Sequence, residues 1–576
     1  MAVRGLESTE SNVISMPEAR KDIRKKSDWG VPEPTATPDL VEAPPGSPPF
    51  VPMAPWRSVL YFLSSVMLFL TQGLGMNLAL ANLNQIQGSI AATTTEAAWL
   101  SAAYMAPNVS LGILLVKVRM QYGVRALAKV AVICFIGASA LNLFISDLQS
   151  AIVVRFLSGI AAAPLATLGF LYMLEIFPPQ KRGTVGLCLV TMNSMLGAPL
   201  TRLVSPTLID FGGWRGLYTL EMSLALLVLP IIFLLPLTAP PRVKVIVRTD
   251  VVSYLFIAIG YGCVAVALSV GRPYWWFEAP WLGVMLVVAV ASLFIAAMIE
   301  LGREHPLVDF RWLLSWRNIH IFGILLIFRL LTGEQSAIVM LWYQNIGLLF
   351  DQLQMLYLII LVFTVVGGFV CAALLNRGYS RSIQVVALVI LATGAFIDSQ
   401  TTSLTRPEQM YLSQALVAMG SAMFVPPTLA DFFNSAFAKG PAYVVTFFVV
   451  FMFTQVIGAL VATASYGTFI TIREKFHSSI LAEQITLTNP IVANRLSTLA
   501  APYAKVVGDP TLMNSEGLTL LSAQVTREAN TLAFGDAFFV AGAIAVVALA
   551  LMLIHMTYQS LHSKLARSSA PSAAVA

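Results

Sequence analysis

The sequence predicts an all-α polytopic membrane protein with fourteen transmembrane helices. Three observations support this class: the composition, the length of the apolar stretches and the distribution of charge between them. Of the 576 residues, 57% are hydrophobic and 11% are charged, and the mean hydropathy is +0.78. Soluble domains carry about 25% charged residues. A chain this poor in charge is therefore expected to lie mostly within a lipid bilayer.

The apolar stretches are long enough to cross the hydrocarbon core. A spanning helix needs roughly 20 mainly apolar residues, and helices are favoured because each satisfies its own backbone hydrogen bonds in lipid. The fourteen predicted spans are residues 57–82, 97–116, 126–146, 149–174, 185–208, 215–236, 250–270, 279–300, 318–345, 355–376, 381–400, 409–432, 441–471 and 534–557.

The charges between the spans predict the orientation. If the amino terminus is cytoplasmic, the loops on that side are rich in Lys and Arg, beginning with Lys117 and Arg119. The short loops on the other side carry Arg215, Arg272 and Arg406. Such a bias marks the cytoplasmic side of a membrane protein. Both termini are therefore expected in the cytoplasm.

Three segments are expected to lie outside the membrane. Residues 1–55 are polar and proline-rich, so we predict a disordered cytoplasmic tail whose basic run, residues 20–26, either is solvated or touches anionic lipid. Residues 561–576 form a second cytoplasmic tail. The external loop 472–533 reads as short amphipathic helices broken at prolines, which pack on the membrane surface, cover the transport path or dock a partner.

Several classes of function find no support in the sequence. The four cysteines fall within apolar stretches, and the five histidines are scattered, so no metal site or disulfide framework is predicted. No glycine-rich phosphate loop or nucleophile elbow is present, so neither a cofactor nor an enzyme is expected. The net charge of +6 is explained by the cytoplasmic loops, so no nucleic-acid partner is expected.

Four segments, taken together, resemble the fourteen-helix drug:proton antiporter branch of the major facilitator superfamily. They are "RFLSGIAAAPLATLGFLYMLEIFPPQKRG" (155–183), "GGWRGLYTLEM" (212–222), "EHPLVDFRWLLSWRN" (304–318) and "LWYQNIGLLFDQLQ" (341–354). The resemblance implies two six-helix lobes, here 56–236 and 304–560, with two extra helices in 237–303. Such lobes rock about a substrate site near the membrane midplane.

Arg155 opens the segment with the clearest resemblance, and the matching arginine of the branch is linked to proton coupling. It either faces a polar path inside the lobe or snorkels to the interface. Gly159 begins a small-residue surface for close helix packing. Gly123 and Arg125 match the branch's cytoplasmic loop between the second and third spans, although Met120 stands where that loop has an aspartate. Glu175 matches the acidic residue before "FPP" and is expected to organise the inner loop.

The first and fifth spans depart from the branch. Gln72 stands where the branch has an acid, while Asn77 matches its asparagine. A glutamine does not titrate, so this span cannot carry a proton there; its polar face binds either a substrate or another helix. In the fifth span Gly197 and Pro199 match the antiporter motif, but Arg202 replaces a glycine and adds a second cation, which is either interior or near the outer end.

Three further charges fall within predicted spans. Glu221 lies about two turns into the sixth, and Arg329 and Glu334 lie in the ninth. Five residues of helix rotate a side chain by about 140° from the first, so Arg329 and Glu334 are poorly placed to neutralise each other. A desolvated glutamate can exchange a proton reversibly. Glu334 is therefore the preferred candidate for a proton carrier, and a structural ion pair is the alternative.

These observations favour a secondary transporter that exports a small organic or toxic compound by alternating access, driven by protons. An importer or facilitator of an anionic or polar metabolite, not driven by protons, is the alternative, because an acid is lost and Arg202 is gained. The expected location is the inner membrane of a bacterium. The expected partners are the bilayer, a small-molecule substrate, protons and, through the loop 472–533, a periplasmic adaptor protein.

Overall fold

A computed structural model describes residues 53–238, 242–303, 306–439, 441–506 and 508–568. Within these ranges the regular structure is helical, and thirteen segments are long and apolar enough to cross a membrane. One of them, Pro179–Leu234, has a break at Gly212 and Gly213 and so contains two spans. The all-α polytopic fold is thus confirmed. Most of the predicted amino-terminal tail, residues 1–52, lies outside the described residues, as do residues 569–576.

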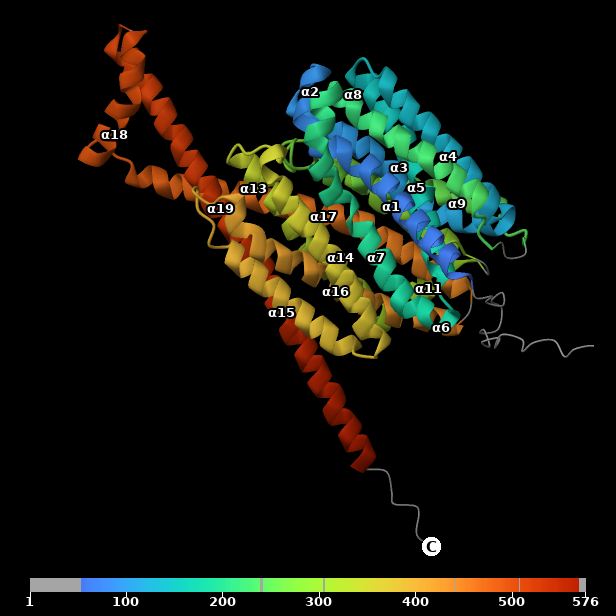
Figure 1. Ribbon diagram of the computed structural model, residues 1–576. Coiled ribbons are helices and arrows are strands. Elements are labelled where there is room, and N and C mark those ends of the chain that lie inside the picture. The colour runs from blue at the N-terminus through green and yellow to red at the C-terminus, as the bar shows by residue number, and fades with distance from the viewer. Residues whose placement is uncertain (1–52, 239–241, 304–305, 440, 507, 569–576) are drawn as a thin grey trace, which may run out of the picture.

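The amino-terminal lobe contains the first six spans (Figure 1). Its helices are α1 (Pro55–Ala81), α3 (Thr94–Tyr122), α4 (Val124–Leu141), α5 (Leu148–Ile176), α7 (Leu187–Met195) and α8 (Gly197–Leu234), joined by α2 (Leu83–Ser89), α6 (Pro179–Lys181) and the π-turn η3 (Arg182–Gly186). Helix α8 holds the outer part of the fifth span and all of the sixth. Gly213 has φ +58, a left-handed conformation that favours glycine, so the chain can reverse direction there.

The two extra helices, α9 (Arg248–Val270) and α10 (Pro280–Leu301), pack on α3. A buried ion network fixes them: Asp250 Oδ1 lies 2.8 Å from Lys117 Nζ and 2.5 Å from a guanidinium nitrogen of Arg303, which also pairs with Glu300. Lys117 was expected in a loop, but it is buried in the last turns of α3. Its partner Asp250 explains the difference, because a buried lysine is tolerated when it is paired.

The carboxy-terminal lobe contains the remaining six spans. Its helices are α11 (Phe310–Leu313), α12 (Trp316–Gly333), the π-turn η4 (Glu334–Ile338), α13 (Val339–Asn345), α14 (Gln354–Asn376), α15 (Ser380–Asp398), α16 (Tyr411–Lys439), α17 (Pro441–Gln484), α18 (Pro490–Ala500) and α19 (Pro510–Ser568), with 3-10 turns at η5 (Phe350–Leu353), η6 (Pro407–Met410) and η7 (Ala501–Lys505). Residues 561–568, predicted as tail, continue α19.

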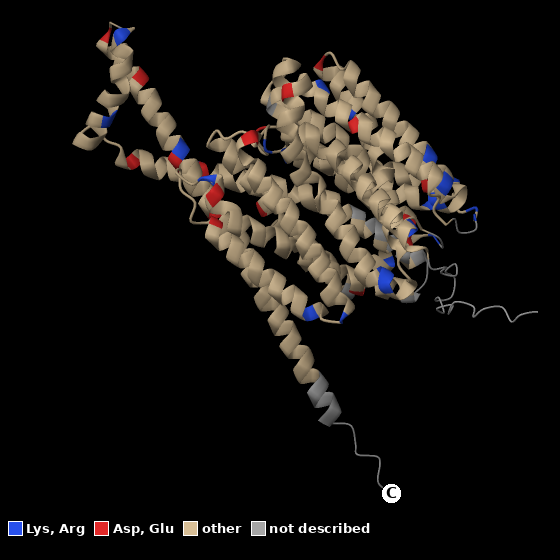
Figure 2. Cartoon of the chain, in the orientation of Figure 1, with Lys and Arg blue, Asp and Glu red and all other residues tan. Residues whose placement is uncertain are grey.

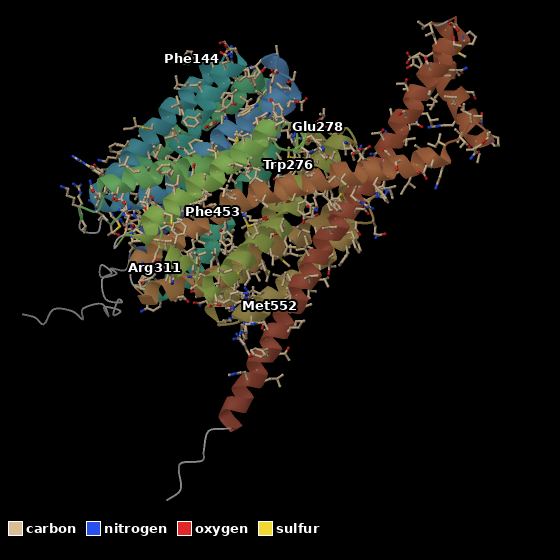
Figure 3. All side chains as sticks on the ribbon, turned by 180° about the vertical axis from the view of Figure 1, so that it is seen from behind. Phe144, Trp276, Glu278, Arg311, Phe453 and Met552 are labelled. Carbon is tan, nitrogen blue, oxygen red and sulfur yellow. The ribbon has the colours of Figure 1, made fainter. Side chains whose placement is uncertain are left out.

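The lobes meet along two seams. In the first, α7 and α8 pack on α14, and the Sγ atoms of Cys188 and Cys371 lie 3.6 Å apart. In the second, α17 packs on α3 and α9, where the rings of Phe453 and Tyr261 are 4.8 Å apart; Phe453 is labelled on α17 in Figure 3. A continuous hydrophobic cluster that includes Phe170 of one lobe and residues of the other fills the space between them.

The loop 472–533 differs from its prediction. Helices α17 and α19 continue beyond the bundle and carry α18 between them, so the segment forms a projecting helical hairpin (Figure 1). Helix breaks do occur near the predicted prolines, since α18 and α19 begin at Pro490 and Pro510. Arg473 and His477 of α17 contact Asp536 of α19 at 2.6 and 2.8 Å and tie the two helices together where they leave the bundle.

The two ends of the bundle differ in charge. Many Lys and Arg residues gather at the end away from α18 (Figure 2). Arg119 lies in the last turn of α3, Lys181 ends α6 and Arg377 follows α14. We refer to this end as the basic end and to the opposite end, where α18 projects, as the hairpin end. The loop after α15 lies at the hairpin end, and so does the start of α16.

Candidate functional site

Arg155 lies at the centre of a buried cluster in the amino-terminal lobe, which we term the Arg155 cluster and which also contains Gly75, Tyr104, Ser139 and Glu221. Arg155 is 1% exposed, and both terminal guanidinium nitrogens donate to Gly75 O at 3.1 Å. Its guanidinium carbon lies 4.3 Å from the centre of the Tyr104 ring, a cation–π distance. The side chain therefore faces the lobe interior and does not snorkel.

Glu221 of α8 completes the Arg155 cluster. It is fully buried, and its Oε1 accepts a long 3.4 Å hydrogen bond from Ser139. A Cβ at Gly75 would lie only 3.0 Å from that oxygen, so the glycine makes room for the acid beside the carbonyl that Arg155 binds. The arginine and the glutamate thus interact around one glycine. Their opposite charges offset much of the cost of burying each.

A second cluster lies in the carboxy-terminal lobe and contains two carboxyl groups. We term Glu334, Asp398, Ser413 and Gln414 the acid cluster. The Nε2 group of Gln414 donates to Glu334 Oε1 at 3.0 Å and to Asp398 Oδ2 at 2.7 Å. Ser413 donates to Asp398 Oδ1. The two carboxyl groups also lie close enough to share a hydrogen bond. All four side chains are at most 1% exposed.

The orientation of the bridging amide is set by a neighbour. Gln335 Nε2 donates to Gln414 Oε1 at 3.0 Å, so the amino group of Gln414 must face the two acids. Asp398 accepts two donors, whereas Glu334 accepts one and its Oε2 has no partner among the described residues. No ion pair within the described part of the chain joins Glu334 or Asp398 to a cation. Ionisation of both carboxyl groups at such a short separation is energetically unfavourable.

Arg202 connects the two lobes next to the acid cluster. From α8 it donates to Ser336 O at 3.1 Å and contacts Met340 Sδ at 3.2 Å. Its guanidinium also lies 5.3 Å from the centre of the Tyr357 ring. Ser336 belongs to η4, the π-turn that begins at Glu334. A π-turn alters the regular helical hydrogen bonding and is frequent at functional sites. One short turn therefore carries both Glu334 and the acceptor of the lobe-to-lobe contact.

Arg329 does not join the acid cluster. Its guanidinium donates to Gln455 Oε1 of α17, and a Cβ at Gly458 would touch its side chain. The alternative of an ion pair between Arg329 and Glu334 is therefore absent from the described contacts. The angular separation expected on a helix accounts for this, because the two side chains point to different neighbours.

The polar residues of the first span form contacts both within their own helix and to α8. Asn77 Nδ2 donates to Gly73 O of its own helix at 2.7 Å, and Gln72 is half-buried on the same helix. Asn82, just after α1, donates to Ser205 Oγ of α8 at 2.9 Å. Of the two interpretations left open for this polar face, the contacts of Asn82 match bonding across helices.

The remaining motif residues lie at close packing positions and at the basic end. A Cβ at Gly159 would lie 2.2 Å from Tyr104 O, and one at Gly197 would lie 2.8 Å from Gly73 Cα. Pro199 is buried two residues further along α8. Gly123 ends α3 with a φ of +88. Arg125 and Glu175 bind the segment that follows α8: Arg125 Nε donates to Leu237 O at 2.9 Å, and Glu175 Oε1 accepts from Thr238 N at 2.7 Å.

Sequence reasoning did not find Asp398, Gln414 and Gln335 as partners of Glu334. Asp398 is the last residue of α15, and a helix-end position does not by itself indicate burial, yet its side chain is buried. The available signal was the pair of glutamines within apolar helices, since polar groups inside a membrane protein usually bind one another. Gln414 lies 79 residues from Gln335 and 80 residues from Glu334 in the chain, a separation that helix periodicity does not reveal.

The geometry of two helical lobes agrees with comparisons to known proteins. The family model of the Major Facilitator Superfamily matches residues 58–463. The multidrug export protein EmrB of Haemophilus influenzae is 23% identical over 45% of this chain and 51% of its own length. The uncharacterised MFS-type transporter YhcA of Bacillus subtilis is 20% identical over 83% of this chain and 88% of its own length.

Two further matches complete the comparison. The fatty acid resistance protein FarB of Neisseria gonorrhoeae is 25% identical over 39% of this chain and 44% of its own length, so the match spans less than half of FarB. A solved structure of the proton:xylose symporter XylE is 15% identical with a TM-score of 0.51, over 86% of this chain and 95% of that one; it is similar in fold. The chain therefore belongs to the major facilitator superfamily of membrane transporters, and within it resembles the fourteen-helix drug:proton antiporters.

Proposed function

We propose that the protein is a proton-driven exporter of a small organic or toxic compound in the cytoplasmic membrane of a bacterium. The excess of Lys and Arg at the basic end supports a cytoplasmic position for that end and for both termini. The likeness to drug exporters, EmrB among them, supports the direction of transport. The lobes, residues 56–236 and 304–560, rock about a substrate site near the membrane midplane.

The observation that carries proton coupling is that η4 holds both Glu334 and Ser336, the acceptor of Arg202. Glu334 is the proton carrier of this proposal: with Asp398 it forms a buried pair in which one bound proton leaves a single shared negative charge. When the pair is protonated, η4 keeps its present geometry and Arg202 holds the lobes together at the hairpin end. Loss of the proton leaves two buried negative charges, which favours a rearrangement of η4 and releases Arg202.

Alternating access follows from the position of that contact. Arg202 closes the hairpin end, whereas Cys188 and Cys371 lie at the other half of the same seam. Opening the hairpin end requires Arg202 to leave Ser336. A switch of this kind needs only a difference of a few kcal/mol between two packings of the lobes.

The hairpin formed by α17, α18 and α19 supports a protein partner on the external side. Its exposed apolar side chains, Phe476, Ile480, Leu487, Ile491 and Leu512, are unusual for a segment outside the bundle. A periplasmic adaptor protein that offers an apolar helical surface fits them. Replacement of Leu487 and Ile491 by Ser tests this partner, because capture of the adaptor from the same genome should fall while transport in liposomes is retained.

The test of the main proposal uses proteoliposomes with an imposed pH gradient. A panel of amphipathic organic compounds, including fatty acids, is offered, and flux is measured with and without an ionophore that collapses the gradient. We expect at least one compound to move against the proton flow, with flux reduced at least tenfold when the gradient is collapsed or when Glu334→Gln is introduced.

Two results would change the proposal. Flux of a compound that ignores the gradient would remove proton coupling and favour the importer or facilitator of an anionic metabolite, for which Arg202 offers an unneutralised cation. Flux that is proton-driven but unchanged in Glu334→Gln would keep the exporter and remove Glu334 as its proton carrier.

A further inference from the structure

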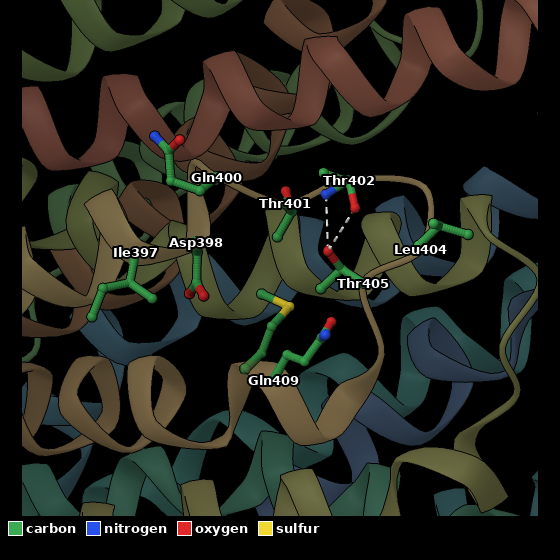
Figure 4. Close-up of a pocket in the computed structure, with 9 residues that line it drawn as sticks. Ile397, Asp398, Gln400, Thr401, Thr402, Leu404, Thr405 and Gln409 are labelled. Carbon is green, nitrogen blue, oxygen red and sulfur yellow. Dashed lines mark hydrogen bonds between the residues drawn. The ribbon is translucent and has the colours of Figure 1, made fainter.

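A cavity of about 330 Å³ lies beside the acid cluster at the hairpin end. It is bounded by the end of α15, the following loop and the start of η6 (Figure 4). Much of its lining is polar, contributed by Asp398, Thr401, Thr402, Thr405 and Gln409. A space of this size and polarity can hold several waters, each of which occupies about 30 Å³ in the liquid.

The loop that bounds the cavity holds it open. Thr405 Oγ1 accepts from Thr402 N at 2.8 Å, a bond drawn in Figure 4, and fixes the turn. Gln409 Oε1 accepts from Arg406 N at 2.9 Å. Thr401 Oγ1 is buried and has no partner among the described residues. A buried hydroxyl that lines a polar cavity and lacks a protein partner is well placed to bind water.

Asp398 lies between this cavity and Glu334. It lines the cavity and is itself only 1% exposed, and its carboxyl lies within hydrogen-bonding reach of Glu334. A small void beside Glu334 is lined by apolar groups, including Leu331, Ala395 and Ala541, and has no volume for water. A proton that reaches Glu334 from the hairpin end therefore has a geometric route through Asp398.

We infer that protons enter from the external side through water in this cavity and bind first to Asp398, from which they pass to Glu334. This inference rests on the proposed proton-driven function. A proton from water in the cavity binds an Asp398 oxygen. The new O–H bond at Asp398 then breaks as an O–H bond forms at Glu334, which returns Asp398 to its carboxylate form.

The groups around the acid cluster are consistent with proton transfer between Asp398 and Glu334. Tyr343 interacts electrostatically with Asp398, Tyr411 and Glu408, and Tyr466 interacts with Glu334. Two cations approach this region: Arg202 donates to Ser336 O of η4, and Arg329 donates to Gln455 of α17. Gln414, fixed by Gln335, holds the two carboxyl groups in register and is a positioning residue.

The experiment is a reversible block of the cavity in intact protein. Thr401→Cys is treated from the external side with sulfonatoethyl methanethiosulfonate, a charged thiol reagent that does not cross membranes. Arg406→Cys is the matched control, because Arg406 lies exposed in the same loop but does not line the cavity. The unmodified protein with its four native cysteines reports any background reaction. Proton-driven flux and substrate exchange at equal pH are both measured.

We expect the reagent to reduce proton-driven flux of Thr401→Cys at least tenfold and to leave substrate exchange at equal pH within about twofold of its starting rate. Dithiothreitol should reverse the effect. Arg406→Cys and the unmodified protein should be unaffected. Asp398→Asn should lose proton-driven flux as Glu334→Gln does. Full flux in labelled Thr401→Cys, or in Asp398→Asn when Glu334→Gln is inactive, would overturn the inlet and leave the proposed function intact. Full proton-driven flux in Glu334→Gln as well would remove Glu334 as the proton carrier, and flux of the parent that ignores the gradient would mean that the proposed function itself fails.

Discussion

The two lobes bury charge in opposite ways. In the Arg155 cluster a cation is buried with an acid, and a backbone carbonyl and an aromatic face complete its surroundings. In the acid cluster two carboxyl groups share one amide with no cation bound to either among the described ion pairs. The first arrangement combines one cation with one acid, although no ion pair between Arg155 and Glu221 is among the described contacts. The second is neutral only after it binds protons.

This difference indicates which charges serve the fold and which serve the transport step. A cation and an acid buried together have little reason to exchange protons, and removal of one of them should cost stability. An unbalanced pair beside a polar cavity can exchange protons with water, and its conversion to amides should cost coupling but not folding. The predictions below test the comparison, from the largest expected effect to the smallest.

Arg155→Met should have the largest effect on stability. It leaves Glu221 buried without its counter-charge, and breaking a buried pair from one side costs about 3–5 kcal/mol. We expect a large loss of folded protein, measured by thermal unfolding in detergent. The double variant with Glu221→Gln should recover much of the loss, because no unpaired charge remains. Equal instability of the single and double variants would contradict a balanced pair.

Arg202→Met should shift the balance between lobe arrangements. It removes a charged hydrogen bond to Ser336, a contribution of about 1.5–3 kcal/mol, which corresponds to a change of about tenfold or more in an equilibrium. We expect external thiol reagents to reach a cysteine placed at Tyr357 about tenfold faster than in the parent. An unchanged rate would show that this contact does not hold the hairpin end closed.

Gly75→Ala should have the smallest effect of the three. The new Cβ would lie 3.0 Å from Glu221 Oε1, and overpacking of this kind costs about 1–3 kcal/mol. Gly88→Ala is the control, because a Cβ there meets nothing within 4 Å. Thermal unfolding should separate the two variants. A match between them would mean that Gly75 does not make room for Glu221.

The sequence predicted more of the fold than of the site. Apolar stretches and loop charges were sufficient for the spans, since a bilayer leaves few alternatives to helices. For Arg155 the cost of charge in lipid left an interior and an interfacial position open, and the side chain is buried in the interior. The groups that bind Arg155 and Glu334 could not be predicted, because Gly75 binds Arg155 through its backbone and Gln414 reaches Glu334 from another helix. Such contacts depend on how helices pack, which a local pattern does not encode.

The most direct test of the central claim is a count of the protons that the purified protein binds. Proton uptake is measured with a pH indicator between about pH 8 and pH 5, for the parent, for Glu334→Gln with Asp398→Asn, and for Glu221→Gln. Because two close carboxyl groups titrate as one unit, we predict that the double variant binds about one to two protons fewer than the parent. Glu221→Gln should match the parent. Equal uptake by the parent and the double variant, with a loss in Glu221→Gln instead, would contradict the account and place the proton in the amino-terminal lobe.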